Sequence, residues 1–231
     1  LNDYEKALES INQSLLIYRE IAQNRGDSTG IMICYGQLGD IYNQMDNPEK
    51  GLDYHLKALR LRKRTEVIPA IADGMTGVGQ TYFMLGKYKT AKDYFLRSQE
   101  LRREANFLDG MSTNFKYLGY IANKMNKEKQ AMQFFQKGLE LSRELNQSKT
   151  ESDILREMAI IYTNRNNFVK AWEAYQKYLN RKNSILNNQI SKRIASIQLQ
   201  HQIEKQSNAN ERIAKENKIK ELKLARSRII F

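Results

Sequence analysis

Several residue types that other classes of protein depend on are scarce in this chain. Its 231 residues include one cysteine, Cys34, two prolines, two histidines and one tryptophan. A single cysteine cannot form an intramolecular disulfide, so a disulfide-stapled fold is excluded. No stretch approaches 18 consecutive apolar residues, and the sequence therefore predicts no membrane-spanning helix within residues 1–231.

The residue sets that catalysis and metal binding require are also missing. His201 has no second histidine and no cysteine near it, so no zinc-type cluster can be assembled. The sequence has no glycine-rich phosphate loop and no Ser/His/Asp or Cys/His set with supporting context. We therefore predict a non-enzymatic chain with no cofactor and no metal site.

What the chain does contain is an internal repeat of 40 residues. The recurring positions are Leu38, Val78, Leu118 and Met158; Gly39, Gly79, Gly119 and Ala159; Tyr42, Tyr82, Ala122 and Tyr162; Gly51, Ala91, Ala131 and Ala171; and His55, Phe95, Phe135 and Tyr175. Self-similarity at a fixed period of about 20–50 residues is typical of stacked-repeat proteins. Because His55 stands where later units have an aromatic ring, we expect it to be a packed ring and not a ligand.

The spacing within a unit predicts two antiparallel helices. The Leu-Gly-x-x-Tyr positions share one face of a first helix, and the small residue and the ring four residues later share one face of a second. Pro48 fits the first turn of that second helix, because its missing N–H has no partner there anyway. Each helical hairpin then needs a neighbour to cover its apolar face. The expected breaks within the hairpins are residues 45–48, 85–87, 125–127 and 165–167.

This pattern resembles the tetratricopeptide repeat, with the period lengthened to 40 residues. The resemblance covers residues 1–180, and it implies an all-α, right-handed superhelical solenoid of helical hairpins. Residues 3–20 resemble a second helix without its first, so we expect a half repeat followed by four repeats. The longer period predicts longer helices or longer turns between hairpins.

In this family, ligands bind a concave groove lined by the first helices, and the resemblance places a protein or peptide ligand there. An acidic peptide or a C-terminal carboxylate fits the two basic residues of the set. The groove positions, with the candidate binding residues first, are Asn43, Gln80, Phe83, Lys116, Tyr120, Asn123 and Arg156, followed by Gly36, Asp40, Thr76, Ile160 and Thr163.

The positive charge is concentrated in the last 51 residues. Residues 181–231 hold twelve Lys and Arg against four Glu, whereas the whole chain has a net charge of +12. This tail has no glycine or proline and reads as one long helix. Tested as a coiled coil, its seam is apolar at Ile190, Ile194 and Ile197 but polar from 201 to 218. The polar stretch is either a solvated linker or a weak, switchable seam, and the tail is a candidate for homodimerisation.

The tail resembles a region of membrane sensor proteins of Bacteroidetes-type bacteria. The residues that carry this resemblance are 183–206 and 216–231, the latter including "KELKLARSRII". It implies a periplasmic repeat domain, a membrane adjacent to the C-terminus, and a two-component histidine kinase or a helix-turn-helix regulator beyond it. The C-terminal helix would then relay ligand binding across the membrane.

Two other functions fit the sequence. The chain is alternatively a soluble, cytoplasmic scaffold or adaptor that dimerises or docks through its basic helix. The tail charge also suits nucleic acid or an anionic membrane surface. Nucleic acid is not expected, because Phe231 is the only aromatic residue of the tail and single-strand binding depends on stacked rings.

Overall fold

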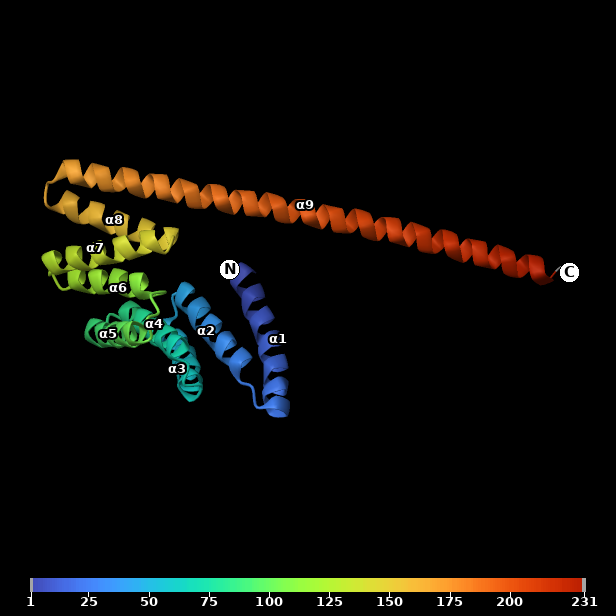
Figure 1. The fold of residues 1–231 in the computed structure, drawn as a ribbon, viewed down its shortest axis with the longest axis horizontal. Coiled ribbons are helices and arrows are strands. Elements are labelled where there is room, and N and C mark those ends of the chain that lie inside the picture. The colour runs from blue at the N-terminus through green and yellow to red at the C-terminus, as the bar shows by residue number, and fades with distance from the viewer. Residues whose placement is uncertain (1, 230–231) are drawn as a thin grey trace. The chain divides into compact units, whose positions relative to one another are not determined.

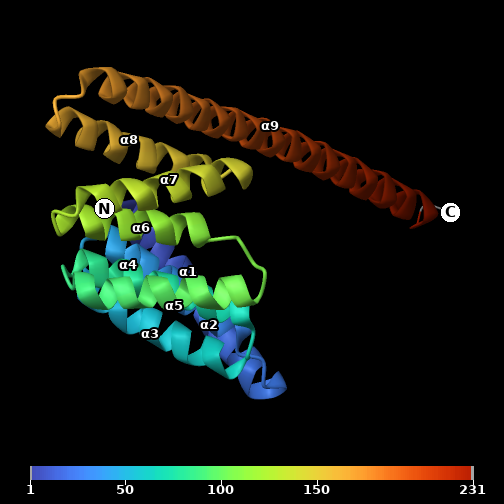
Figure 2. The same cartoon turned by 60° about the vertical axis from the view of Figure 1, so that its left-hand side comes forward.

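The structure, a computed structural model, describes the backbone of residues 2–229 and the side chains of residues 3–212 and 215. Every element among these residues is a helix, and successive helices stack as hairpins (Figures 1 and 2). The elements are α1 (Asn2–Arg25), α2 (Thr29–Gln44), α3 (Pro48–Arg64), α4 (Ile68–Met84), α5 (Tyr88–Glu104), α6 (Met111–Lys124), α7 (Glu128–Glu144), α8 (Ser148–Asn164) and α9 (Phe168–Ile229). The prediction of an all-α repeat solenoid followed by a long helix is confirmed.

The 40-residue period comes from long helices joined by short turns. Five of the helices have 17 residues, and most turns that follow them have three. In the turn between α2 and α3, Asp46 has a φ of 57°, and the N–H of Asn47 donates to the carbonyl of Tyr42 at 2.9 Å. This is the left-handed cap that commonly ends helices. The same conformation recurs every 20 residues, at Glu66, Gly86, Asn106, Asn126, Asn146 and Asn166.

Three of the hairpins close by packing a ring of the second helix over a glycine of the first. A methyl group added to Gly39 would lie 2.7 Å from the ring of His55, and one added to Gly79 would lie 3.0 Å from Phe95. His55 is 4% exposed, as the sequence predicted for a packed ring. The first helix of each of these hairpins can therefore approach the second only because no side chain stands between them.

The fourth hairpin departs from this arrangement. It has Ala159 where the others have glycine, and the corresponding ring, Tyr175, is 43% exposed. The rings of Phe95 and Phe135 are fully buried. In this hairpin the ring is therefore not packed over a glycine, because the first helix has none at that position.

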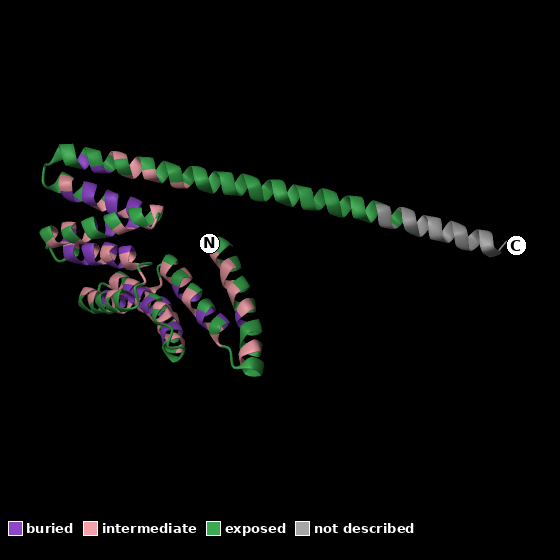
Figure 3. Ribbon diagram, viewed as in Figure 1, coloured by how far each residue is buried: buried purple, intermediate pink, exposed green. Residues whose placement is uncertain are grey.

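The hydrophobic core runs through the stacked hairpins and does not extend along the tail. Neighbouring hairpins share clusters such as that of Phe95 with Leu118 and that of Phe135 with Ile154. The chain divides into two compact units, residues 1–181 and 182–231. In the second unit every described side chain from residue 186 to 212 is exposed (Figure 3).

We expect Gly119→Ala to destabilise the solenoid by roughly 1–3 kcal/mol, the usual cost of overpacking a core. The added methyl group would clash with the ring of Phe135, which is fully buried. Urea unfolding followed by circular dichroism measures the change. Gln133→Ala, at an exposed position of α7, is the control.

A second substitution tests whether the clash with the Phe135 ring causes the loss of stability. Combining Gly119→Ala with Phe135→Leu replaces the ring by a smaller side chain and should recover part of the lost stability. An unchanged midpoint for Gly119→Ala alone would show that the glycine is not needed for the close approach.

Candidate functional site

The first helices of the four hairpins form a common face. Helices α2, α4, α6 and α8 contact one another in that order, so their outward residues line one continuous surface. We call it the first-helix face. Two pockets on it contain predicted groove residues: a polar pocket of about 390 Å³ and an aromatic pocket of about 270 Å³.

The aromatic pocket brings together residues from three consecutive first helices. Four of the seven candidate binding residues line it, namely Phe83, Tyr120, Asn123 and Arg156, together with Lys124 and Glu157. The ring centroids of Phe83 and Tyr120 lie 5.9 Å apart, and Tyr117 packs edge-on against both. Arg156 Nη2 donates to Glu157 Oε1 at 3.1 Å. These rings form a wall that a flat or apolar side chain can contact.

Electrostatics keep this wall neutral and its rim cationic. Burial, with Asp153 and Glu157 nearby, raises the pKa of Tyr120 well above its ordinary value. Burial likewise raises the pKa of Tyr117 to about 12. Both hydroxyls are protonated at neutral pH, and that of Tyr120, which lines the pocket, can donate a hydrogen bond there. With Lys124 and Arg156 against Glu157, the pocket carries one excess positive charge.

Two of the predicted groove residues connect neighbouring hairpins instead of lining a pocket. The amide of Asn43 donates to Thr81 Oγ1 at 2.8 Å. Lys116 is 8% exposed, and its ammonium donates to Asp153 Oδ2 at 2.9 Å. Their partners lie on the next first helix, so these side chains are engaged in holding hairpins together.

The polar pocket is built around a buried arginine. Arg102 is 1% exposed, and its guanidinium donates to the Asp73 carboxylate and to the Asp109 carbonyl. Gly110, with a φ of 78°, lies against this guanidinium, and any side chain there would overlap it. The remaining predicted residue, Gln80, lines this pocket.

A second arginine, Arg62, lines the same pocket and stands 40 residues before Arg102. Burial lowers the pKa of Arg62, and the charges of Asp73 and Asp40 oppose that shift. Burial raises the pKa of Asp40, and the charge of Arg62 opposes that shift. Burial and, second, Arg62 lower the pKa of His55 to about 4. His55 is therefore neutral at physiological pH, and the exposed groups of this pocket are mainly carboxylates.

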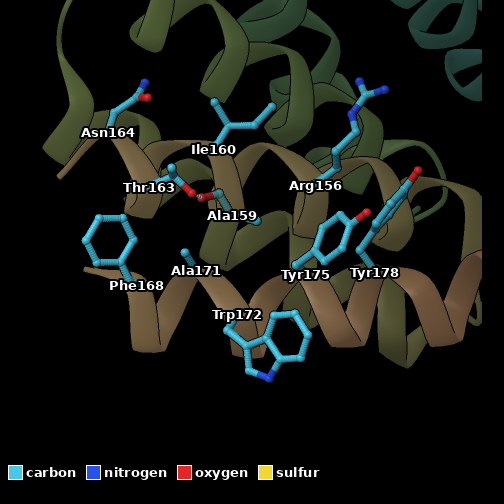
Figure 4. A pocket seen from close by; sticks show the side chains of 10 residues that line it. All are labelled: Arg156, Ala159, Ile160, Thr163, Asn164, Phe168, Ala171, Trp172, Tyr175 and Tyr178. Atoms are coloured by element: carbon cyan, nitrogen blue, oxygen red, sulfur yellow. Dashed lines mark hydrogen bonds between the residues drawn. The ribbon is translucent and has the colours of Figure 1, made fainter. Parts of the chain in front are cut away.

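A larger cavity lies at the last described hairpin. It includes the predicted groove positions Arg156, Ile160 and Thr163, whereas its α9 side was not predicted from the sequence. It measures about 750 Å³ and is formed by α8 and the start of α9 (Figure 4). We call it the terminal cradle. Its lining residues are Arg156, Ala159, Ile160, Thr163, Asn164, Phe168, Ala171, Trp172, Tyr175 and Tyr178. Trp172, the only tryptophan of the chain, is 64% exposed there and was the available signal.

The described residues contain neither a metal-binding cluster nor a membrane-spanning helix. No group of three or more His, Cys, Asp or Glu side chains among them is placed to hold a metal ion. Within the same residues, no helix combines the length and apolar character needed to cross a membrane.

Comparison with known families identifies the repeat. Two family models, both described as tetratricopeptide repeat, match residues 30–104 and 118–145. The matched segments cover α2 to α5, the second half of α6, and α7. The chain therefore contains tetratricopeptide repeats, as its sequence pattern predicted. No curated protein sequence matches the chain significantly.

Solved structures share the fold at low sequence identity. BtubC (BKLC) from P. vanneervenii matches with a TM-score of 0.64 and 15% identity over 78% of this chain and 74% of that one. The apo form of RapI matches with a TM-score of 0.59 and 15% identity over 80% and 79%. A Rap protein complexed with competence and sporulation factor matches with a TM-score of 0.53 and 20% identity over 80% and 60%. At these identities the likeness concerns the fold alone.

His55 makes the stability of the solenoid sensitive to acid. Its pKa falls from 6.5 to about 4 in the folded chain. Between these values the unfolded chain binds more protons, so the free energy of unfolding decreases as the pH falls from 6.5 towards 4. We expect His55→Phe, which installs the ring found in the next two repeats, to remove about 2 kcal/mol of the loss between pH 7 and pH 5. Parallel pH profiles for the two proteins would refute this.

Proposed function

We propose that the chain is a non-enzymatic scaffold that binds an extended segment of a partner protein along its first-helix face. The observation that carries this proposal is the aromatic pocket. Four residues selected from repeat positions alone, on α4, α6 and α8, meet there around one cavity. A site shared by three hairpins suits a ligand that lies across the repeats.

The chemistry of the two pockets suggests what the segment contains. The aromatic pocket suits an aromatic or long aliphatic side chain next to a carboxylate, because its walls are rings and its excess charge is positive. The polar pocket has the carboxylates of Asp40, Asp73 and Asp109 against the guanidinium groups of Arg62 and Arg102. Its excess charge is negative and suits a cationic group. Gln80 and Phe83 lie one turn apart on α4, so one extended segment can contact both pockets.

The comparisons support a binding role. The tetratricopeptide repeat is an interaction scaffold, and the matched residues include Gln80, Phe83 and Tyr120, which line the two pockets. One protein of the same fold, a Rap protein, is complexed with competence and sporulation factor. The identity of the present partner does not follow from that likeness.

A sensor role is a finer form of the same proposal. Residues of the terminal cradle and residues of the tail belong to one helix, α9, so a change in the cradle acts directly on that helix. Residues 216–231, on which part of the resemblance to membrane sensors rests, lie outside the described side chains. Sequencing the parent reading frame beyond codon 231 tests the sensor role. An apolar run of about 20 residues followed by a kinase or helix-turn-helix module supports the sensor. Polar sequence or a stop codon favours the soluble adaptor.

Selection of peptides from a displayed library of random dodecapeptides tests the binding proposal. We expect enriched sequences to place an aromatic or aliphatic residue beside Asp or Glu. Arg156→Glu should weaken the best synthetic peptide at least tenfold, or about 1.4 kcal/mol, because it reverses a charge at the pocket rim. Fluorescence anisotropy of the labelled peptide measures the change.

Arg97→Glu is the matched control. It makes the same charge reversal at an exposed position of α5, away from the first-helix face. Equal loss of affinity in both variants would indicate non-specific charge attraction. Failure to enrich any peptide would count against peptide binding altogether.

A further inference from the structure

We propose that the terminal cradle binds a helix, and that this helix is α9 of a second copy of this chain. The two α9 helices would pair antiparallel, each placing its residues 190–197 in the cradle of the other. The pairing shares only Arg156 with the aromatic pocket. Its failure would therefore leave the peptide-binding proposal intact.

The solenoid itself shows what such a cradle receives. In the preceding unit, Phe135 of α7 is fully buried by Ile154, Met158 and Ile161 of α8. Helix α8 follows α7 after a three-residue turn, so the covering helix runs antiparallel to the helix it covers. Among the described residues, no further first helix follows α9. Phe168 and Trp172 are each 64% exposed as a result.

A segment of the tail has the same apolar spacing as the helix that covers α7. Ile190, Ile194 and Ile197 follow the interval of four and three residues that separates Ile154, Met158 and Ile161. All three tail isoleucines are about half exposed. The chain thus has an uncovered cradle and also a tail segment with the apolar spacing of α8, the helix that covers α7.

The cradle residues and the tail residues form one stripe along α9. Its positions are Phe168, Trp172, Tyr175, Leu179, Asn183, Leu186, Ile190, Ile194, Ile197 and His201. From Trp172 onwards they repeat every 11 residues, which corresponds to 3.67 residues per turn and keeps them on one side of a helix. All but the central Asn183 and the final His201 are apolar.

The spacing of this stripe reads the same in both directions. The successive intervals are 4, 3, 4, 4, 3, 4, 4, 3 and 4 residues. A two-fold axis between residues 184 and 185 therefore places every member opposite another member. Trp172 meets Ile197, Tyr175 meets Ile194, and Leu179 meets Ile190 of the second copy. Such self-complementarity is what a two-fold symmetric interface requires.

Two observations favour this arrangement over a parallel one. Helix α8 runs antiparallel to α7, which it covers, and we expect the same direction for the helix that covers α9. A parallel pair would also leave each cradle facing the same cradle of the second copy and would stack Trp172 on Trp172. The region 168–201 has six Lys and Arg and one Glu, so added salt should strengthen the association by screening repulsion.

Disulfide cross-linking tests the pairing and its direction. In a Cys34→Ala background, Tyr175→Cys combined with Ile194→Cys should give a covalent dimer on mild oxidation. The two positions lie 19 residues apart on one helix, about 28 Å, so they cannot join within a chain. The single variants Tyr175→Cys and Ile194→Cys should not cross-link. Efficient cross-linking of either single variant would show a parallel pair and overturn the proposal.

Sedimentation equilibrium supplies the second test, on the otherwise unmodified chain. We expect a dimer at tens of micromolar protein, and Ile194→Glu/Ile197→Glu should raise its dissociation constant at least a hundredfold. Leu199→Glu/Ile203→Glu is the matched control. These residues are equally exposed, on the same helix but off the stripe, and should leave the dimer intact. A monomeric wild-type chain, or equal loss in both variants, would overturn the proposal.

Discussion

The packing of a ring against a glycine is the contact on which the solenoid depends. It lets the two helices of a hairpin approach closely, and that approach sets where the next hairpin can sit. The arrangement occurs at Gly39, Gly79 and Gly119, each beneath the ring of its own second helix. Because the covered ring also contacts the following first helix, one local contact fixes both the hairpin and its stacking. The first-helix face is a consequence of this stacking.

The hairpins could be predicted because their determinants recur in the sequence at a fixed interval. The glycine, the ring and the turn are each local, and three repetitions make them visible. The aromatic pocket was also within reach, since Phe83 and Tyr120 occupy groove positions of the repeat. The roles of Asn43 and Lys116 were not, because their partners, Thr81 and Asp153, lie 38 and 37 residues away on the next hairpin. A single repeat does not show whether a groove residue is used by its neighbour.

The α9 side of the terminal cradle escaped prediction for a different reason. Its residues occupy ordinary repeat positions, and Tyr175 stands where Phe95 and Phe135 are fully buried in interior hairpins. Among the described residues, no first helix follows α9 to cover this ring. Exposure at the end of a stack is therefore a property of the assembly, whereas the sequence of the hairpin itself remains that of an interior one. The replacement of glycine by Ala159 and the single tryptophan, Trp172, were the local signs of the change.

The turns have a consequence for how such a chain comes apart. The cap inside a hairpin and the cap between hairpins have the same left-handed residue at the same 20-residue interval. Neither kind of turn is therefore an intrinsically weaker joint. In a linear stack whose stability is a sum of neighbouring contacts, opening then begins wherever the interface is poorest. The two helices of one hairpin contact each other more extensively than helices of neighbouring hairpins do, so the chain should fray from its ends hairpin by hairpin.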